Sequence, residues 1–220
     1  MKSVYKHLTE RSAPITKKEL VDNEELMKAV YTDNVDKVKE EFKNVPNSNP
    51  NMKDSQGRTL LYGCRHSEIA KILIDKGAEL ENTDNNQGET PLAHASYYHR
   101  EKVMEVLLKA GANPNCTYDP KNRQKDNDSG MTPLHFMASY DKLDMVQLLV
   151  KKGADINATD DLKITPLMVC FMGKSLAKKT AKFLIEKGAD INATDHLGQT
   201  ALTYAFARTK DKNVLYMLQG

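Results

Sequence analysis

The sequence predicts an all-α solenoid of stacked helix-turn-helix units that are joined by polar β-turn fingers. Two observations predict it. The same eight letters, GADINATD, stand at residues 153–160 and again at 188–195. A glycine also follows a leucine-rich stretch four times, at Gly77, Gly111, Gly153 and Gly188. Segments that recur in phase at roughly 20 to 50 residues are typical of proteins in which each unit packs only on its neighbours.

Each unit is expected to begin with a short helix at a Thr-Pro-Leu motif. The motif starts at Thr90, Thr132 and Thr165. A threonine side chain can accept a hydrogen bond from the free N–H groups of the first turn, and proline at the first helical position loses no hydrogen bond. TPL therefore marks the start of the first helix in a unit.

A second, amphipathic helix should follow after a short polar break. Val103, Val106 and Leu107 are spaced to form one apolar stripe, as are the apolar residues of 145–149. The glycine behind this helix ends it, because only glycine adopts the left-handed conformation at no steric cost. The segment ADINATD that follows is dense in turn formers and leads into the next unit. Asp160 and Asp161 are read here as turn formers.

This pattern resembles the ankyrin repeat family. The residues that carry the resemblance are GETPLAHASYYHREKVMEVLLKAGANPN at 88–115 and GMTPLHFMASYDKLDMVQLLVKKGADIN at 130–157. Several anchors recur together over residues 23–220, including both copies of GADINATD. We divide the chain as follows: an extension or capping helix at 1–22, an N-terminal cap at 23–54, repeat one at 55–84, repeat two at 85–117, a finger insertion at 118–128, repeat three at 129–159, repeat four at 160–194 and a C-terminal cap at 195–220.

Three departures from the family pattern are visible. Repeat one lacks about a turn of helix near Arg65 and His66. The finger insertion is polar and is expected to be extended and mobile. Repeat four has Lys163 where the finger glycine belongs, and its first helix or the following connection near Gly173 must be longer.

The resemblance implies a protein-binding scaffold with no cofactor and no metal, and we expect a monomer that binds another protein as an adaptor or inhibitor. In this family the finger tips and the exposed side of the first helices line a concave face. The matching positions in this chain are Arg58, Glu89, Tyr97, Tyr98, Met131, Ser139, Tyr140, Leu162, Ile164, Met172, His196, Leu197 and Arg208.

Most of these candidate residues in repeats two to four are tyrosine, methionine or branched aliphatic residues. Solvent-facing positions of a monomer do not need that composition, and tyrosine, methionine and arginine are enriched in interface cores. A purely structural interpretation stays open for individual residues: Tyr97 or Tyr98 could pack on a neighbouring repeat, and Leu162 and Leu197 could shield the finger base. For the group as a whole, the composition favours a binding surface.

Catalytic interpretations find little support. His94 and His99 are five residues apart, which is not the i, i+4 spacing of a helical metal pair. For His135, in TPLH, the resemblance implies a structural imidazole that bonds to nearby backbone. No phosphate-binding glycine loop and no HExxH motif occurs in the sequence. We therefore predict that the protein is not an enzyme.

The cysteines and the overall composition suggest a reducing compartment. Cys64, Cys116 and Cys170 are far apart and odd in number, which argues against a disulfide framework. Cys64 and Cys170 fall at small buried positions, whereas Cys116 lies in a finger and is expected to be more exposed and oxidisable. No apolar run is long enough for a membrane span or a signal peptide. A cytoplasmic location is expected, or the cytosol of a host cell if the protein is secreted.

A different class of function depends on lysine. The formal net charge is only +2, so no global field draws the chain to nucleic acid. The lysines of repeats three and four nevertheless cluster: Lys151, Lys152, Lys178, Lys179 and Lys182. Binding to nucleic acid or an anionic surface is therefore kept as the alternative, although most of these residues fall on second helices, the convex side. The Lys-rich and Asn-rich usage is also compatible with a viral protein or a host-directed effector.

Overall fold

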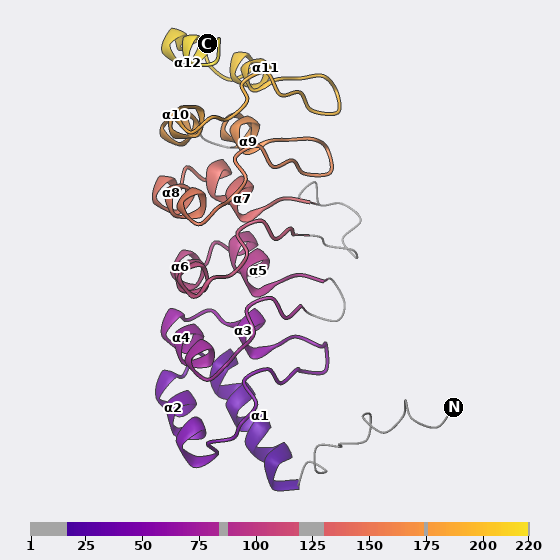
Figure 1. Ribbon diagram of the computed structural model, residues 1–220, viewed down its shortest axis with the longest axis vertical. Coiled ribbons are helices and arrows are strands. Elements are labelled where there is room, and N and C mark those ends of the chain that lie inside the picture. The colour runs from indigo at the N-terminus through magenta and orange to yellow at the C-terminus, as the bar shows by residue number, and fades with distance from the viewer. Residues whose placement is uncertain (1–16, 84–87, 119–129, 174–175, 220) are drawn as a thin grey trace, which may run out of the picture.

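A computed structural model describes residues 17–83, 88–118, 130–173 and 176–219, with side chains from residue 24 onward. In these ranges the chain forms six pairs of helices, stacked one upon another from the N-terminal to the C-terminal end (Figure 1). The described part contains no strand, only two isolated β-bridges at finger bases. The predicted all-α solenoid is confirmed. Residues 119–128 of the predicted finger insertion and residues 1–16 of the predicted extension lie outside the described residues.

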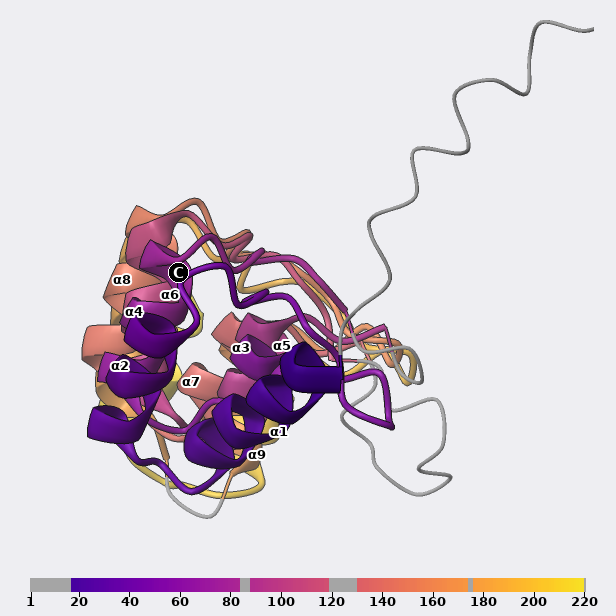
Figure 2. The same cartoon turned by 90° about the horizontal axis from the view of Figure 1, so that it is seen from below.

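The helices form two layers, and the fingers extend to one side of them (Figure 2). The first helices are α1 (Lys17–Tyr31), α3 (Leu60–Gly63), α5 (Pro91–Tyr97), α7 (Pro133–Ser139), α9 (Pro166–Met172) and α11 (Ala201–Phe206). The second helices are α2 (Val35–Asn44), α4 (Ser67–Asp75), α6 (Glu101–Ala110), α8 (Leu143–Lys151), α10 (Lys178–Glu186) and α12 (Lys212–Met217).

The helix boundaries follow the local chemistry. Thr90 and Thr165 cap α5 and α9, each accepting a hydrogen bond from the backbone N–H three residues on, at 3.2 and 3.3 Å. Proline occupies the start of both helices. Gly111 ends α6 in the left-handed conformation, with φ of 102°. Lys163 takes the glycine position of its finger with φ of 59°, which is uncommon for a residue with a Cβ.

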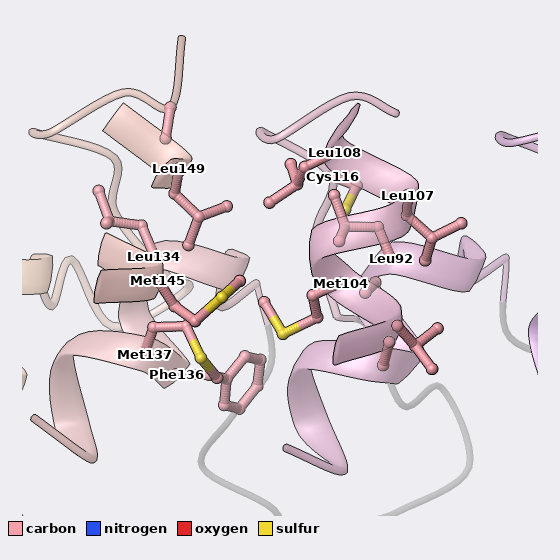
Figure 3. Close-up of a cluster of buried hydrophobic side chains, with 14 of the residues drawn as sticks. Leu92, Met104, Leu107, Leu108, Cys116, Leu134, Phe136, Met137, Met145 and Leu149 are labelled. Carbon is pink, nitrogen blue, oxygen red and sulfur yellow. The ribbon is translucent and has the colours of Figure 1, made fainter. Parts of the chain in front are cut away.

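The core is continuous along the stack because each repeat buries its apolar side chains against the next. Figure 3 shows side chains of repeats two and three facing each other. In this view Met104 of α6 points toward the side chains of repeat three, among which Phe136 and Met137 of α7 are labelled. All three are buried. A methionine side chain can fill such an irregular junction because it has three rotatable bonds.

The repeated letters GADIN build a polar link between neighbouring repeats. The Asn157 side chain accepts a hydrogen bond from Asp190 N (2.9 Å) and donates one to Gly188 O (3.4 Å). Asn115 makes the same pair of bonds to Asp155 N and Gly153 O. An amide side chain is suited to this role because it both donates and accepts. The asparagine link thus satisfies backbone groups just after α8 and α10 from the preceding repeat.

Helix α3 is only four residues long, whereas α5, α7 and α9 have seven each, which confirms the predicted shortening of repeat one. Arginines from following units satisfy exposed carbonyl groups around it. Arg100 donates to Cys64 O at 2.9 Å, and Arg65 donates to Tyr31 O at 2.6 Å. In repeat four the extra residues lie in the connection from Gly173 to Ala177 and not in the helix.

We expect the N-terminal units to open more readily than repeats two and three. A shorter first helix contributes less packing to its two interfaces, and the stability of a stacked array is approximately a sum of unit and interface terms. Native-state hydrogen exchange read by mass spectrometry should show faster exchange for peptides from α3 and α4 than for peptides from α5 to α8. Uniform protection along the array would contradict this prediction.

All three cysteines are buried, and this corrects the expectation for Cys116. Burial raises the pKa of Cys64 to about 11 and that of Cys116 to about 12, and it also raises the pKa of Cys170. Cys64 and Cys170 are inert core thiols, as predicted. Cys116 was predicted to be exposed and oxidisable because it follows a polar turn. The prediction was wrong, because Cys116 belongs to the hydrophobic core and contacts the capping Thr90 of its own repeat.

Candidate functional site

A hollow of about 450 Å³ opens on the first-helix side of repeats two to four. Its walls come from the ends of α5, α7 and α9 and from the fingers that precede α7 and α9. The side chains and backbone around it belong to Tyr97, His99, Met131, Phe136, Ser139, Tyr140, Asp160, Leu162, Ile164, Val169, Met172 and Gly173. Most of this lining is aromatic or aliphatic, and Asp160 and His99 are its titratable side chains.

The hollow gathers seven of the thirteen predicted residues: Tyr97, Met131, Ser139, Tyr140, Leu162, Ile164 and Met172. The most exposed are Tyr140, at 53%, and Met172, at 40%. Their exposure matches the expectation for a binding surface, because large apolar side chains around a recess are exposed to solvent. Their role in binding stays a prediction.

Tyr97 has a packing role as well. Its ring is stacked on that of Tyr118, with centroids 4.2 Å apart, and meets Phe136 edge-on at 5.8 Å. The structural interpretation of Tyr97 therefore holds in part, since the ring both supports the finger and forms a wall of the hollow. Tyr140 stands on the opposite side, where its ring meets His99 at 3.9 Å. Burial, and then the charge of Lys142, lowers the pKa of His99.

Two predicted contact residues, Glu89 and Ile164, are buried and correct the sequence interpretation. The Glu89 carboxylate accepts a hydrogen bond from the Tyr62 hydroxyl at 2.9 Å. Ile164 reaches only the floor of the hollow, and its carbonyl group meets the ring of His135 at 3.0 Å. Both residues directly precede a capping threonine. Arg58 and Met131 also precede a capping threonine and are only partly buried, so the position alone does not determine burial.

A second hollow, of about 380 Å³, lies over repeats one and two and includes the predicted residues Arg58 and Tyr98. Arg58 forms an ion pair with Asp54 at 2.7 Å, and the charge of Arg65 is paired with Asp33 at 3.1 Å. Arg100 lies over the Tyr98 ring, 5.1 Å from its centroid. These arginines are engaged within the fold, so the second hollow is a weaker candidate for an anion site than its composition suggests.

The remaining predicted residues lie at the C-terminal end of the face, outside both hollows. His196 Nδ1 contacts Leu162 O at 3.1 Å, and Arg208 donates to Met172 O at 3.4 Å. Leu197, at a finger tip, is strongly exposed. His196 and Arg208 therefore connect repeat four to the C-terminal cap, whatever else they contact.

The sequence did not predict five residues of the hollow: His99, Phe136, Asp160, Val169 and Gly173. Asp160 is the only carboxylate among the described lining residues. Its Oδ1 atom accepts hydrogen bonds from Leu162 N at 2.9 Å and from Ile164 N at 2.7 Å, which is the turn-forming role expected of it. The residue is only 5% exposed, and within the described ranges its Oδ2 atom has no hydrogen-bond partner. Burial raises the pKa of this carboxyl, and the neighbouring charge of Asp161 adds to the effect.

His135 has the structural role that the resemblance implied. Thr132 N donates to its Nδ1 atom at 3.1 Å, so the proton is on Nε2, which donates to Ile164 O. Burial lowers the pKa of the ring to about 4. No group of three or more potential metal-ligating side chains occurs in the described part of the chain.

The lysines of the alternative interpretation are exposed on or beside α8 and α10. Two of them have acidic partners: Lys178 lies 2.7 Å from Asp211, and Lys182 lies 3.9 Å from Glu186. These contacts reduce the positive field of that side. Within the described ranges, none of the helices combines the length and the apolar character needed to cross a bilayer.

Comparison with known proteins gives consistent results. Family models described as ankyrin repeats match residues 26–118 and 116–195 in one case and 174–219 in another. A curated relative, the ankyrin repeat protein L92 of Acanthamoeba polyphaga mimivirus, is 38% identical over 71 residues, covering 30% of this chain and 17% of that protein. Calmodulin-binding transcription activator 5 of Arabidopsis thaliana is 36% identical over 78 residues, covering 34% of this chain and 8% of that protein. The chain thus matches only a small part of the length of these relatives.

Solved structures are similar over most of both chains. The ankyrin repeat protein EF0377 has a TM-score of 0.71 and 28% identity, covering 89% of this chain and 96% of that one. A chain from the complex of the predatory endopeptidase Bd0816 of Bdellovibrio bacteriovorus with immunity protein Bd3460 has a TM-score of 0.72, with the same identity and coverage. With the helix pairs, the fingers and the family matches in agreement, the chain belongs to the ankyrin repeat family.

Proposed function

We propose that the protein is a non-catalytic adaptor or inhibitor that binds a partner protein in the hollow of repeats two to four. Ankyrin repeats indicate a protein–protein interaction module, and the family is generally non-catalytic. The observation that carries the proposal is the hollow itself, in which the exposed side chains of Tyr140 and Met172 flank apolar walls. Aromatic anchors around a recess are typical of binding hot spots.

Removal of the two exposed side chains should abolish capture of the partner. The variant carries Tyr140→Ala and Met172→Ala and leaves Tyr97 in place, because Tyr97 also supports the finger. Wild type and variant are immobilised and exposed to a reducing lysate of the native source, and retained proteins are quantified by mass spectrometry. We expect recovery of the specific partner to fall more than about tenfold, since hot-spot residues typically contribute 2 kcal/mol or more.

A matched control is Tyr216→Ala, in α12. Tyr216 is also a strongly exposed aromatic residue, at 66%, but it does not line the hollow. The control should retain the partner, and circular dichroism should be unchanged in both variants. Equal recovery by the wild type and the double variant would remove the binding site from this hollow.

The mimiviral relative and the complex with an immunity protein support a setting in which one protein acts on another inside a host or competitor cell. We propose that setting as a refinement of the adaptor or inhibitor role. Lysine-mediated binding to an anionic surface has less support, because Lys178 and Lys182 have acidic partners.

A further inference from the structure

The described part of the chain contains three equivalent finger turns whose aspartates can be compared directly. Asp54, Asp160 and Asp195 each accept, through Oδ1, the backbone N–H groups two and four residues further on, at 2.7 to 2.9 Å. The turns therefore place the second carboxylate oxygen in the same way. What differs among them is the group that this oxygen meets.

In the two outer turns the second oxygen is satisfied. Asp54 Oδ2 accepts from the Tyr31 hydroxyl at 2.9 Å and from Arg58 Nε at 2.8 Å. Asp195 Oδ2 accepts from the Tyr204 hydroxyl at 2.5 Å. The pKa values of both carboxyls are lowered, whereas burial raises that of Asp160. A buried carboxylate oxygen without a partner is costly, which makes the middle turn exceptional.

The sequence explains why Asp160 Oδ2 has no hydrogen-bond partner among the described residues. Arg58 is four residues after its aspartate, and the matching residue in repeat four is Ile164. Tyr204 is four residues after the capping threonine Thr200, and the matching residue after Thr165 is Val169.

The third donor position, which Tyr31 occupies for Asp54, also carries a residue that cannot donate to Asp160. Tyr31 is two residues before the left-handed Asp33, and Ser139 is two residues before the left-handed Asp141. The Ser139 hydroxyl is too short to replace a tyrosine and donates to Phe136 O at 2.9 Å. All three substituted residues, Ser139, Ile164 and Val169, line the hollow. The loss of these donor side chains explains the unsatisfied oxygen, and the residues that replace them line the hollow.

We propose that the partner protein supplies the missing donor, and that it is an arginine side chain whose guanidinium group binds Asp160 Oδ2 inside the hollow. This inference rests on the proposed function and names the chemistry of the partner. A guanidinium group both donates hydrogen bonds and neutralises the carboxylate, as Arg58 does for Asp54. The Tyr97 and Tyr140 rings form walls on which its flat face and its aliphatic stem can pack.

The charges around Asp160 are compatible with an incoming cation. Among the described residues, no lysine or arginine lines the hollow. His99 has a lowered pKa and is neutral at pH 7, and Asp161 adds negative charge nearby. His196 is the opposing group, because its positive form would lower the pKa of Asp160. Within the described lining, an incoming arginine therefore meets no lysine or arginine side chain that would compete for Asp160.

The test uses acetyl-arginine methylamide as the probe, titrated into the full ¹⁵N-labelled chain at pH 7 and low salt. The readout is the amide resonances of Leu162 and Ile164, whose N–H groups are bonded to Asp160. We expect saturable shifts with the arginine probe. The citrulline analogue, which has the same shape and no charge, should give no saturable shift.

Two variants complete the test. Asp160→Asn keeps the Oδ1 acceptor and hence the turn, but places an NH₂ group where Oδ2 was, and should weaken the probe at least tenfold. Asp195→Asn is the matched control, because its second oxygen already has Tyr204 as partner, and it should leave the affinity unchanged. The proposal is overturned by an absence of saturable shifts in the wild type, by equal binding of arginine and citrulline, or by equal affinity in Asp160→Asn.

This outcome is separable from that of the proposed function. If capture of the partner depends on Tyr140 and Met172 but the arginine probe fails, the inference alone is wrong. If the probe binds through Asp160 but the Tyr140→Ala, Met172→Ala variant recovers as much partner as the wild type, the proposed binding site of the partner is wrong. The arginine site at Asp160 is then still supported.

Discussion

Replacement of His135 by alanine is expected to lower the free energy of unfolding at pH 7 by about 3 kcal/mol. The ring is fully buried, and it joins Thr132 at the start of α7 to Ile164 in the next finger. Without it, a backbone N–H group and a carbonyl group lose their partner and a cavity opens between repeats three and four. Urea unfolding followed by circular dichroism measures the loss.

The same substitution should flatten the pH dependence of stability. An unfolded histidine binds a proton below its ordinary pKa of 6.5, whereas the pKa in the fold is about 4. The contribution of His135 is therefore fully present above pH 6.5 and is lost progressively as the pH falls towards 4, up to roughly 3 kcal/mol. His99, whose pKa is also lowered, adds in the same direction. Urea unfolding at pH 7, 6, 5 and 4.5 gives the free energy of unfolding at each pH. This free energy should decrease steeply with falling pH for the wild type and less steeply for the variant.

His196→Ala serves as the control, because His196 is exposed and contacts a carbonyl group at the neighbouring finger. It should change stability little and leave the pH profile as it is. A variant at His135 that retained the full decline between pH 6.5 and 4 would show that other groups are responsible for it.

Val169→Tyr is expected to abolish binding of the arginine probe while making the array more stable. The new residue occupies the position of Tyr204 in the next unit, so its hydroxyl can donate to Asp160 Oδ2 as Tyr204 donates to Asp195. Its ring would fill the hollow that Val169 now lines. Burial of apolar surface and a hydrogen bond to a charged group both favour the folded state.

Val169→Phe separates the two effects. Phenylalanine fills the hollow but offers no donor, so it should block the probe without satisfying Asp160. The tyrosine variant should then exceed the phenylalanine variant by about 1 to 3 kcal/mol in free energy of unfolding. If the two variants were equally stable, the second oxygen of Asp160 would not be the unsatisfied group that the geometry indicates.

The helix pairs could be predicted from the sequence because their signals are local. A threonine cap, a proline at the first position and a glycine at the end each act within one turn of backbone. Thr90, Thr165 and Gly111 therefore mark real boundaries. The shortening of α3 was equally visible, since it is a matter of counting residues between landmarks.

The orientation of finger side chains could not be predicted in the same way. Glu89 is buried where Tyr62, in the preceding repeat, donates a hydrogen bond to it, and Cys116 is buried in the core that the stacked repeats share. Both depend on contacts between units. A turn sequence by itself does not say which of its faces meets the neighbouring repeat.

The special position of Asp160 could have been predicted from the sequence, but only by aligning the repeats with one another. Read alone, it is one more turn-forming aspartate. Set in register with Asp54 and Asp195, it is the one of the three that lacks a tyrosine or arginine at each donor position. What distinguishes Asp160 is that a donor side chain is missing. This can be recognised only once the hydrogen-bond donors of Asp54 and Asp195 are known.

The asparagine link between repeats allows whole repeats to be added to or removed from the array. Asn157 meets a glycine carbonyl and an aspartate N–H, and both copies of GADIN offer these same groups. A duplicate of residues 160–194 spliced in behind the original would therefore find a matching junction on its N-terminal side and present another on its C-terminal side. Tandem duplication or deletion could lengthen or shorten the array without redesigning a junction, while the hollow, whose lining ends at Gly173, would keep its walls.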